Sequence, residues 1–342
     1  MNENQNTLAV IDGETLMDMD FPATKFCVET LLPQGICMLG GAPKVGKSWL
    51  VLDLCLRVAK GEPLWEMPTR QGTVLYLCLE DSMRRIKERL WKITDEAPDN
   101  IHFANEARTI NDGLADQLRA FVQAHPDTVL IVIDTFQIIR SNSQDISYAS
   151  EYEEMRLLKS IADELNLTIL LVHHLRKQSD RDPLNMLSGT TGISGALDAV
   201  FVLEKTDRGS DGATLKCTGR DIQDRHLELR LSKESCVWCR ISDSLTEPTL
   251  MLPEPMRELV EFMKQKTYFR GGNTELVNEF NAFSGRSLIA KSLKQLMNNN
   301  RRQLEENHVT FYSFTEKPNR MVEIIYHGPE TDDGNARNAS YE

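Results

Sequence analysis

The chain has 342 residues, of which 41% are hydrophobic and 26% charged, and its formal net charge at pH 7 is −12. This length leaves room for two domains, no apolar run approaches the length of a membrane span, and the polar start of the chain differs from a signal peptide. We therefore expect a globular, cytoplasmic protein that does not enter a membrane. The acidic balance argues against a protein that coats nucleic acid with its whole surface.

The first distinctive pattern in chain order fits the phosphate-loop motif G-x-x-x-x-G-K-[ST] without a gap. It consists of Gly41, Ala42, Pro43, Lys44, Val45, Gly46, Lys47 and Ser48. An apolar run over 35–40 predicts a strand before it, and an apolar helical pattern over 49–59 follows it. Because this motif requires a strand before it and a helix after it, we predict nucleotide binding rather than a chance glycine-rich turn.

The residue types of the loop suit ATP and Mg²⁺. Glycine lets the backbone approach closely enough for successive N–H groups to face phosphate oxygens, and the next helix adds the positive end of its dipole. Lys47 would reach the β- and γ-phosphates, and the Ser48 hydroxyl would ligate Mg²⁺. Trp49 completes the expected nucleotide-binding set.

A second apolar strand, predicted over 72–79, ends abruptly in Glu80 and Asp81. In a doubly wound sheet, ligands bind beyond the carboxyl ends of the strands. We expect Glu80 to orient and deprotonate the water that attacks the γ-phosphate, and Asp81 to cap the helix predicted over 82–93. The alternative is that both carboxylates cap that helix.

After a predicted helix over 114–124, the hydrophobic strand 128–135 contains Asp134 at its end, which is the Walker B form. Asp134 would hold the Mg²⁺ shell opposite Ser48. An aspartate at the end of a strand is by itself an ordinary turn residue. Its position after the phosphate loop and the Glu80 strand favours the metal role.

A polar loop over 140–150 and a helix over 151–165 lead to another apolar strand, 167–174, which ends in two histidines. We expect His174 to contact the γ-phosphate or the attacking water and to report hydrolysis to the next segment. A purely structural histidine pair is the alternative.

The stretch 175–190 is typical of a loop and carries Arg176, Lys177 and Arg181. Exposed basic loops are usually just solvated, but this one begins beside the expected sensor. These three residues are the first candidates for gripping a nucleic-acid backbone.

Further strands are predicted over 199–203, 213–221, 226–231 and 236–241. Arg220 could be an arginine finger that offers its guanidinium to the γ-phosphate of a neighbouring subunit, or it could pair with Asp221 or Asp224. Cys236 and Cys239 form a lone C-x-x-C pair, and since zinc needs four ligands we interpret it as the end of a strand.

Taken in order, the phosphate loop, Glu80, Asp134, His174 and Arg220 resemble RecA-like ATPases of the plasmid RepA helicase group, over residues 25–245. The resemblance implies an α/β fold with a RecA-like P-loop core. It also implies Glu80 as catalytic carboxylate, Asp134 as Walker B acid, and His174 as sensor where RecA and DnaB-type helicases carry glutamine. Arg220 would act in trans within a homo-oligomeric ring, usually a hexamer, that holds single-stranded DNA in its channel.

Charge divides the chain near residue 250. Residues 1–250 carry 27 basic and 38 acidic side chains, whereas residues 251–327 carry 11 and 9. The change coincides with prolines at 248, 253 and 255, which indicates a domain boundary. We expect a mobile segment over 1–24, the ATPase domain over 25–247, a second domain over 254–327 and a disordered tail over 328–342.

The second domain is predicted to contain helices over 256–266, 274–280 and 287–297, then strands over 309–314 and 321–326. Three helices followed by a hairpin are typical of a winged helix, in which the third helix reads duplex DNA and the hairpin touches the backbone. The candidate DNA contacts are Arg286, Ser287, Lys291 and Lys294 on that helix, Arg301 and Arg302 after it, and Lys317 and Arg320 on the hairpin. Winged helices also dock proteins, and a net charge of +2 is a weak DNA-binding footprint.

These features predict an ATP-driven DNA helicase or motor of plasmid, phage or integrative-element replication. The alternative is an ATP-switched initiator or helicase loader that uses the winged helix to find a DNA site or a replication protein. A small-molecule kinase is less consistent with the sequence, because no acceptor-binding lid is evident.

Overall fold

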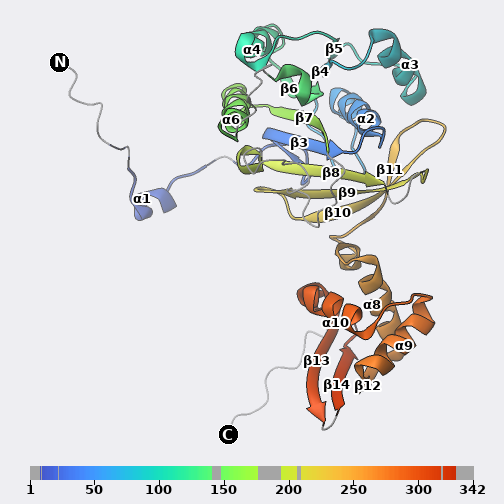
Figure 1. The fold of residues 1–342 in the computed structure, drawn as a ribbon. Coiled ribbons are helices and arrows are strands. Elements are labelled where there is room, and N and C mark those ends of the chain that lie inside the picture. The colour runs from blue at the N-terminus through green and yellow to red at the C-terminus, as the bar shows by residue number, and fades with distance from the viewer. Residues whose placement is uncertain are drawn as a thin grey trace, which may run out of the picture.

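The computed structural model describes residues 8, 10–21, 23–140, 148–175, 194–205, 209–316 and 319–328. Within these residues, a nine-stranded mixed sheet with the order β11-β10-β9-β8-β3-β7-β6-β4-β5 forms the centre of the larger part (Figure 1). The six strands from β8 to β5 in this order are parallel, and β9, β10 and β11 pair antiparallel. The strands are β3 (Gly35–Gly41), β4 (Thr73–Cys78), β5 (Ile101–Ala104), β6 (Thr128–Asp134), β7 (Thr168–His174), β8 (Ala199–Lys205), β9 (Gly212–Gly219), β10 (Arg225–Leu231) and β11 (Trp238–Asp243).

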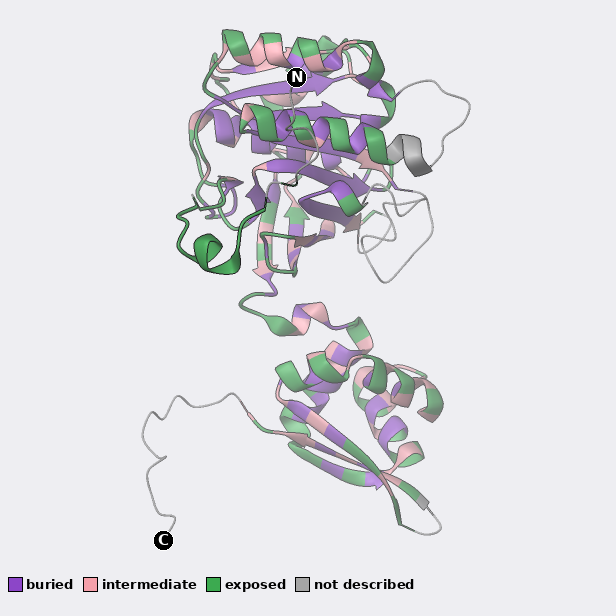
Figure 2. Ribbon diagram, turned by 90° about the vertical axis from the view of Figure 1, so that its left-hand side faces the viewer, coloured by how far each residue is buried: buried purple, intermediate pink, exposed green. Residues whose placement is uncertain are grey.

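Helices cover both faces of this sheet. The first face packs against α2 (Lys47–Lys60) and α3 (Met83–Ile93), and the second against α4 (Leu114–Ala124), α5 (Phe136–Ile139) and α6 (Tyr148–Leu165). The side chains of each parallel strand alternate between the two cores, so these strands are buried on both faces and read as continuous apolar runs. Figure 2 shows the buried strands between helices whose outer faces are exposed.

The parallel strands place the predicted polar residues at one edge of the sheet. Gly41 lies beside His174, and Asp134 pairs with Cys78 and Val172. The carboxyl ends of β3, β4, β6 and β7 therefore meet, as expected for a doubly wound sheet.

Before the sheet, the chain forms the short helix α1 (Gly13–Met17) and the strands β1 (Phe26–Val28) and β2 (Leu32–Pro33). The helix α1 lies within the segment over 1–24 that was expected to be mobile, and it was not predicted. Residues 1–7, 9 and 22 of the expected mobile segment lie outside the described residues.

The C-terminal part has its own hydrophobic core, which includes Met256, Leu259, Phe280, Phe311 and Ile324. Its elements are η3 (Pro248–Met251), α8 (Glu254–Lys266), β12 (Tyr268–Gly272), α9 (Asn273–Ser284), α10 (Ala290–Asn299), α11 (Arg301–Glu306), β13 (Val309–Glu316) and β14 (Asn319–Tyr326). The last two strands form the predicted hairpin, and β12 joins it in a three-stranded antiparallel sheet. Neither β12 nor α11 was predicted.

No helix in the described part of the chain combines the length and apolar character needed to cross a bilayer. All seven cysteines are free, and five are buried. Cys236 and Cys239 are among the described residues. In the described part of the chain, no group of three or more His, Cys, Asp or Glu side chains could hold a metal ion.

Candidate nucleotide-binding site

The phosphate loop connects β3 directly to α2. Gly46 precedes the helix with a φ of +112°, a left-handed conformation that favours glycine, and no side chain caps the helix there. The first N–H groups of a helix have no partner within it. The N-terminus of α2 can therefore bind an anion with its backbone donors and its dipole.

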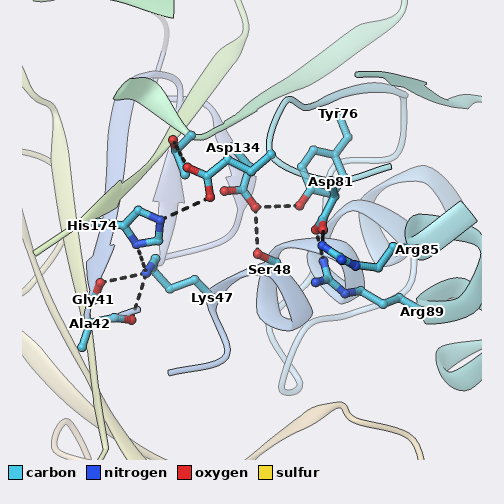
Figure 3. Close-up of polar contacts among 12 residues, drawn as sticks. Gly41, Ala42, Lys47, Ser48, Tyr76, Asp81, Arg85, Arg89, Asp134 and His174 are labelled. Carbon is cyan, nitrogen blue, oxygen red and sulfur yellow. Dashed lines mark hydrogen bonds and ion pairs between the residues drawn. The ribbon is translucent and has the colours of Figure 1, made fainter. Parts of the chain in front are cut away.

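Lys47 lies inside the loop with 5% of its surface exposed. Its ammonium donates to the carbonyls of Gly41 at 2.7 Å and Ala42 at 3.1 Å, and it lies 3.1 Å from Nδ1 of His174 (Figure 3). Burial lowers the pKa of Lys47 to about 8, although the charges of Asp134 and Glu80 act in the opposite direction. A cation is thus held among oxygen acceptors where the loop would receive phosphates.

Two hydroxyls converge on one oxygen of Asp134. Ser48 and Tyr76 each donate to Oδ2 at 2.9 Å, and Asp134 is 6% exposed. Burial raises the pKa of Asp134, while these two hydrogen bonds oppose the rise. A carboxylate beside a serine hydroxyl is a hard oxygen donor set, so the residues present fit Mg²⁺.

Glu80 lies in the turn after β4 and contacts two neighbouring strand ends. Its Oε1 accepts from the Thr135 hydroxyl at 2.9 Å, and its Oε2 is 3.4 Å from Nε2 of His174. An ammonium group has no acceptor, so Nδ1 of His174 accepts from Lys47 and the ring proton is on Nε2, facing Glu80. His174 therefore bridges Lys47 and Glu80, which brings the predicted sensor and the predicted carboxylate together.

The prediction that Asp81 caps the next helix was wrong. Ser82 is the N-cap of α3, and its hydroxyl accepts from the Arg85 backbone N–H at 3.4 Å. Asp81 instead accepts from the side chains of Arg85 and Arg89. Arg89 also lies over the ring of Trp49, with its guanidinium carbon 5.5 Å from the ring centroid.

Arg220 lies far from the phosphate loop of its own chain. Gly219 pairs with Ala199, next to the start of β3, whereas the phosphate loop begins where β3 ends. The Arg220 guanidinium donates to the Gly195 carbonyl at 2.7 Å and lies 3.7 Å from a carboxylate oxygen of Asp198. Its acidic partner is thus Asp198, not Asp221 or Asp224.

The structure describes only some of the residues that were predicted to contact DNA. Arg176, Lys177, Arg181 and Lys317 lie outside the described residues. Lys291 and Lys294 are on α10, as expected, and Arg301 and Arg302 are on α11. Arg320 is exposed in β14.

Arg286 and Ser287 are not on the third helix, because α10 begins only at Ala290. The side chain of Asn281 bonds the N–H of Leu288 at 3.0 Å and its carbonyl at 2.8 Å, which holds this stretch outside the helix. Arg286 pairs with Glu254 at 3.0 Å and with Glu258 of α8. Its guanidinium is therefore engaged within the protein.

Sequence reasoning missed three contributors to the site, namely Tyr76, Thr135 and Trp238. Tyr76 is fully buried in β4 and reaches Asp134 because β4 lies beside β6. Trp238 comes from β11, and its indole N–H donates to the carbonyl of Gly46 at 3.1 Å. The available signal for Tyr76 was a polar aromatic residue within an apolar strand.

A strand, a glycine-rich loop and a helix, with Lys47, Ser48 and Asp134 at their junction, define a P-loop ATPase. Residues 6–180, just over half of the chain, match the AAA domain family AAA_25, and the chain belongs to this family.

Two curated relatives match about half of this chain. The chain is 26% identical over 172 residues to the DNA repair protein RadA of Chlamydia pneumoniae, and 25% identical over 178 residues to the protein of the same name from Streptococcus pneumoniae (strain ATCC BAA-255 / R6). The alignments cover 49% and 51% of this chain but 33% and 36% of the relatives. The chain thus spans about one third of their length.

Two solved structures resemble a little under two thirds of this chain. The ATPase domain of G40P has 15% identity and a TM-score of 0.51, over 61% of this chain and 85% of that one. A DnaB-like replicative helicase, described with its interactions with primase, has 16% identity and a TM-score of 0.51, over 61% of this chain and 57% of that one. At this identity the likeness shows the fold alone, which is the α/β fold that was predicted.

Proposed function

We propose that the chain is an ATP-hydrolysing, helicase-like DNA motor that works as a ring. The convergence of Lys47, Ser48, Glu80, Asp134 and His174 at one edge of the sheet carries this proposal. We assign the catalytic core to residues 25–247. The resemblance to plasmid RepA-type helicases favours a hexamer and a role in replication of a plasmid, phage or integrative element.

Each residue of the site has a proposed task. The backbone of the phosphate loop and Lys47 bind the phosphates, while Ser48 and Asp134 would hold Mg²⁺, which neutralises phosphate charge when it is bound. Glu80 accepts a proton from the attacking water, since its side chain is 47% exposed and can meet solvent. His174 senses the γ-phosphate, because a group that arrives at Lys47 also changes the partner of Nδ1.

Arg220 is proposed to act on the site of a neighbouring copy. It lies at the opposite end of the sheet from its own phosphate loop, and its side chain is 57% exposed. A planar cation in this position suits a charge that develops on a neighbour's γ-phosphate.

DNA as the partner is supported by the names of the relatives, which are a DNA repair protein and a replicative helicase. We propose that Arg176, Lys177 and Arg181, which directly follow the His174 strand, contact single-stranded DNA. The phosphate backbone would supply most of this affinity.

A second candidate, an ATP-switched initiator or loader, is favoured by the C-terminal part. We propose that residues 254–327 are a winged helix with α10 as its recognition helix. This helix has no acidic residue, and within the described residues Lys291 and Lys294 form no ion pair. By contrast, Lys264, Lys266 and Arg286 are paired with glutamates.

Steady-state ATP hydrolysis, measured with and without single-stranded DNA over a range of protein concentrations, tests the two candidates. A motor ring should show strong stimulation by DNA and a specific activity that rises with protein concentration. Lys47→Ala should abolish turnover, and wild-type-like hydrolysis by this variant would refute the site. Slow, DNA-indifferent turnover together with tight binding of duplex DNA would favour the switch.

A further inference from the structure

Trp238 connects an edge strand to the phosphate loop from far away in the sequence. The turn of the hairpin between β10 and β11 and the phosphate loop lie at the same end of the strands of the sheet (Figure 1). Trp238 is the first residue of β11, is 1% exposed, and donates its indole N–H to the carbonyl of Gly46 at 3.1 Å. The same carbonyl accepts the N–H of Leu50, which is the first hydrogen bond of α2.

The ring also fixes the space around Gly46. A Cβ atom added to Gly46 would lie 2.8 Å from Cζ2 of Trp238, closer than real Cβ contacts. Glycine is therefore favoured at position 46 for two reasons. Its backbone is left-handed, and the indole ring leaves no space for a Cβ atom. The backbone conformation of Gly46 in turn sets where the N–H groups of Lys47 and Ser48 point.

Trp238 is itself held by a second tryptophan. The indole N–H of Trp65 donates to the Trp238 carbonyl at 2.7 Å, and both atoms are buried. Trp238 also pairs with Leu231 of β10. The backbone of Trp238 is thus fixed on its strand, and burial of its side chain leaves the indole little room to move away from Gly46.

From these contacts we propose that Trp238 is a positioning residue that holds the phosphate loop in the conformation that accepts phosphates. The proposal rests on nucleotide binding at this loop. A tryptophan that served only the core would stabilise the protein without affecting nucleotide affinity. The carbonyl to which Trp238 donates belongs to the binding loop itself, so affinity should depend on the indole N–H.

Trp238→Phe tests this, because it keeps an aromatic ring and removes the N–H. Loss of one buried hydrogen bond should weaken MgADP binding roughly fivefold and raise the KM for ATP to a similar extent, with kcat nearly unchanged. The matched control is Trp91→Phe, since Trp91 is 66% exposed on α3. This control should bind MgADP as the wild type does.

Calorimetric titration with MgADP and thermal unfolding separate the outcomes. Weaker binding by Trp238→Phe at a temperature where it is fully folded supports the proposal. A lower Tm with unchanged affinity for MgADP would overturn it. Absence of MgADP binding by the wild-type chain would instead refute the ATPase assignment, whatever Trp238 does.

A second measurement covers the case in which Trp238→Phe does not fold. In the full chain labelled with 5-fluorotryptophan, the Trp238 resonance can be assigned by elimination from Trp49→Phe, Trp65→Phe and Trp91→Phe. MgADP should shift the Trp238 resonance and leave that of Trp91 in place. An unmoved Trp238 resonance at saturating MgADP would contradict the proposal.

Discussion

Replacing Lys47 by methionine should stabilise the nucleotide-free protein while it abolishes hydrolysis. Lys47 is 5% exposed, and burial lowers its pKa from 10.5 to about 8. The folded protein therefore holds a charge that would be more stable in water. Methionine has a similar length and no charge, so it removes this penalty.

The magnitude follows from the pKa. A shift from 10.5 to about 8 corresponds to about 3 kcal/mol at neutral pH, since each pKa unit is worth about 1.4 kcal/mol. The carbonyls of Gly41 and Ala42 lose the ammonium but each keeps a backbone donor, from Leu175 and Val45. We expect Lys47→Met to raise the free energy of unfolding at pH 7 by about 1–3 kcal/mol.

The gain should depend on pH with a defined sign. Between about pH 8 and 10.5, Lys47 is protonated in the unfolded chain and neutral in the folded chain, so the unfolded state binds more protons. Wild-type stability from this group therefore rises with pH in that window, and the advantage of Lys47→Met should shrink.

Urea unfolding without nucleotide at pH 7 and pH 9.5 measures this difference. Lys44→Met is the matched control, because Lys44 is exposed in the same loop and should show no such pH-dependent gain. The reasoning is refuted if Lys47→Met is no more stable than the wild type at pH 7, or if its advantage is the same at both pH values.

The remaining predictions concern hydrolysis and DNA. Glu80→Gln should lower kcat by about 10²–10⁴-fold and preserve MgATP affinity, as measured by steady-state kinetics and calorimetry; a small loss would exclude Glu80 as the base. Arg220→Ala should also be inactive alone, but a random equal mixture with Glu80→Gln should regain activity at about a quarter of its sites, because each site then combines the intact residues of two copies. No recovery would argue against action in trans. Lys291→Ala with Lys294→Ala should weaken duplex binding and reduce the salt dependence by about two phosphate contacts, whereas Lys264→Ala should not; equal effects would place the DNA elsewhere.

The phosphate loop was predictable because its function depends on consecutive residues. Gly41 to Ser48 determine the turn, the helix start and the donors locally, and the apolar runs on both sides identify the strand and the helix. The strand ends carrying Glu80, Asp134 and His174 were predictable for a related reason, since parallel strands end at a common edge.

The supporting residues were not predictable, because they depend on the order of the strands. Tyr76 reaches Asp134 only because β4 lies next to β6, and Trp238 reaches Gly46 from 192 residues away. Apolar periodicity shows that such residues are buried but not against which neighbour. The start of α10 was predicted wrongly for a different reason. The side chain of Asn281 bonds the backbone of Leu288 and so keeps this stretch outside the helix.

The positions of Arg220 and the nucleotide site constrain how copies of the chain could assemble. They lie at opposite ends of β3, a strand of seven residues, and so are separated by roughly 20 Å along the sheet. A contact that brings Arg220 of one copy to the loop of the next joins two different surfaces and is head-to-tail, which closes into a ring or continues as a filament. Arg220 is held near Asp198, which also accepts the Ile36 N–H at 2.9 Å and is thus fixed to the start of β3. If Arg220 acts in trans as proposed, an isolated copy has a complete phosphate loop but lacks the arginine needed for fast hydrolysis.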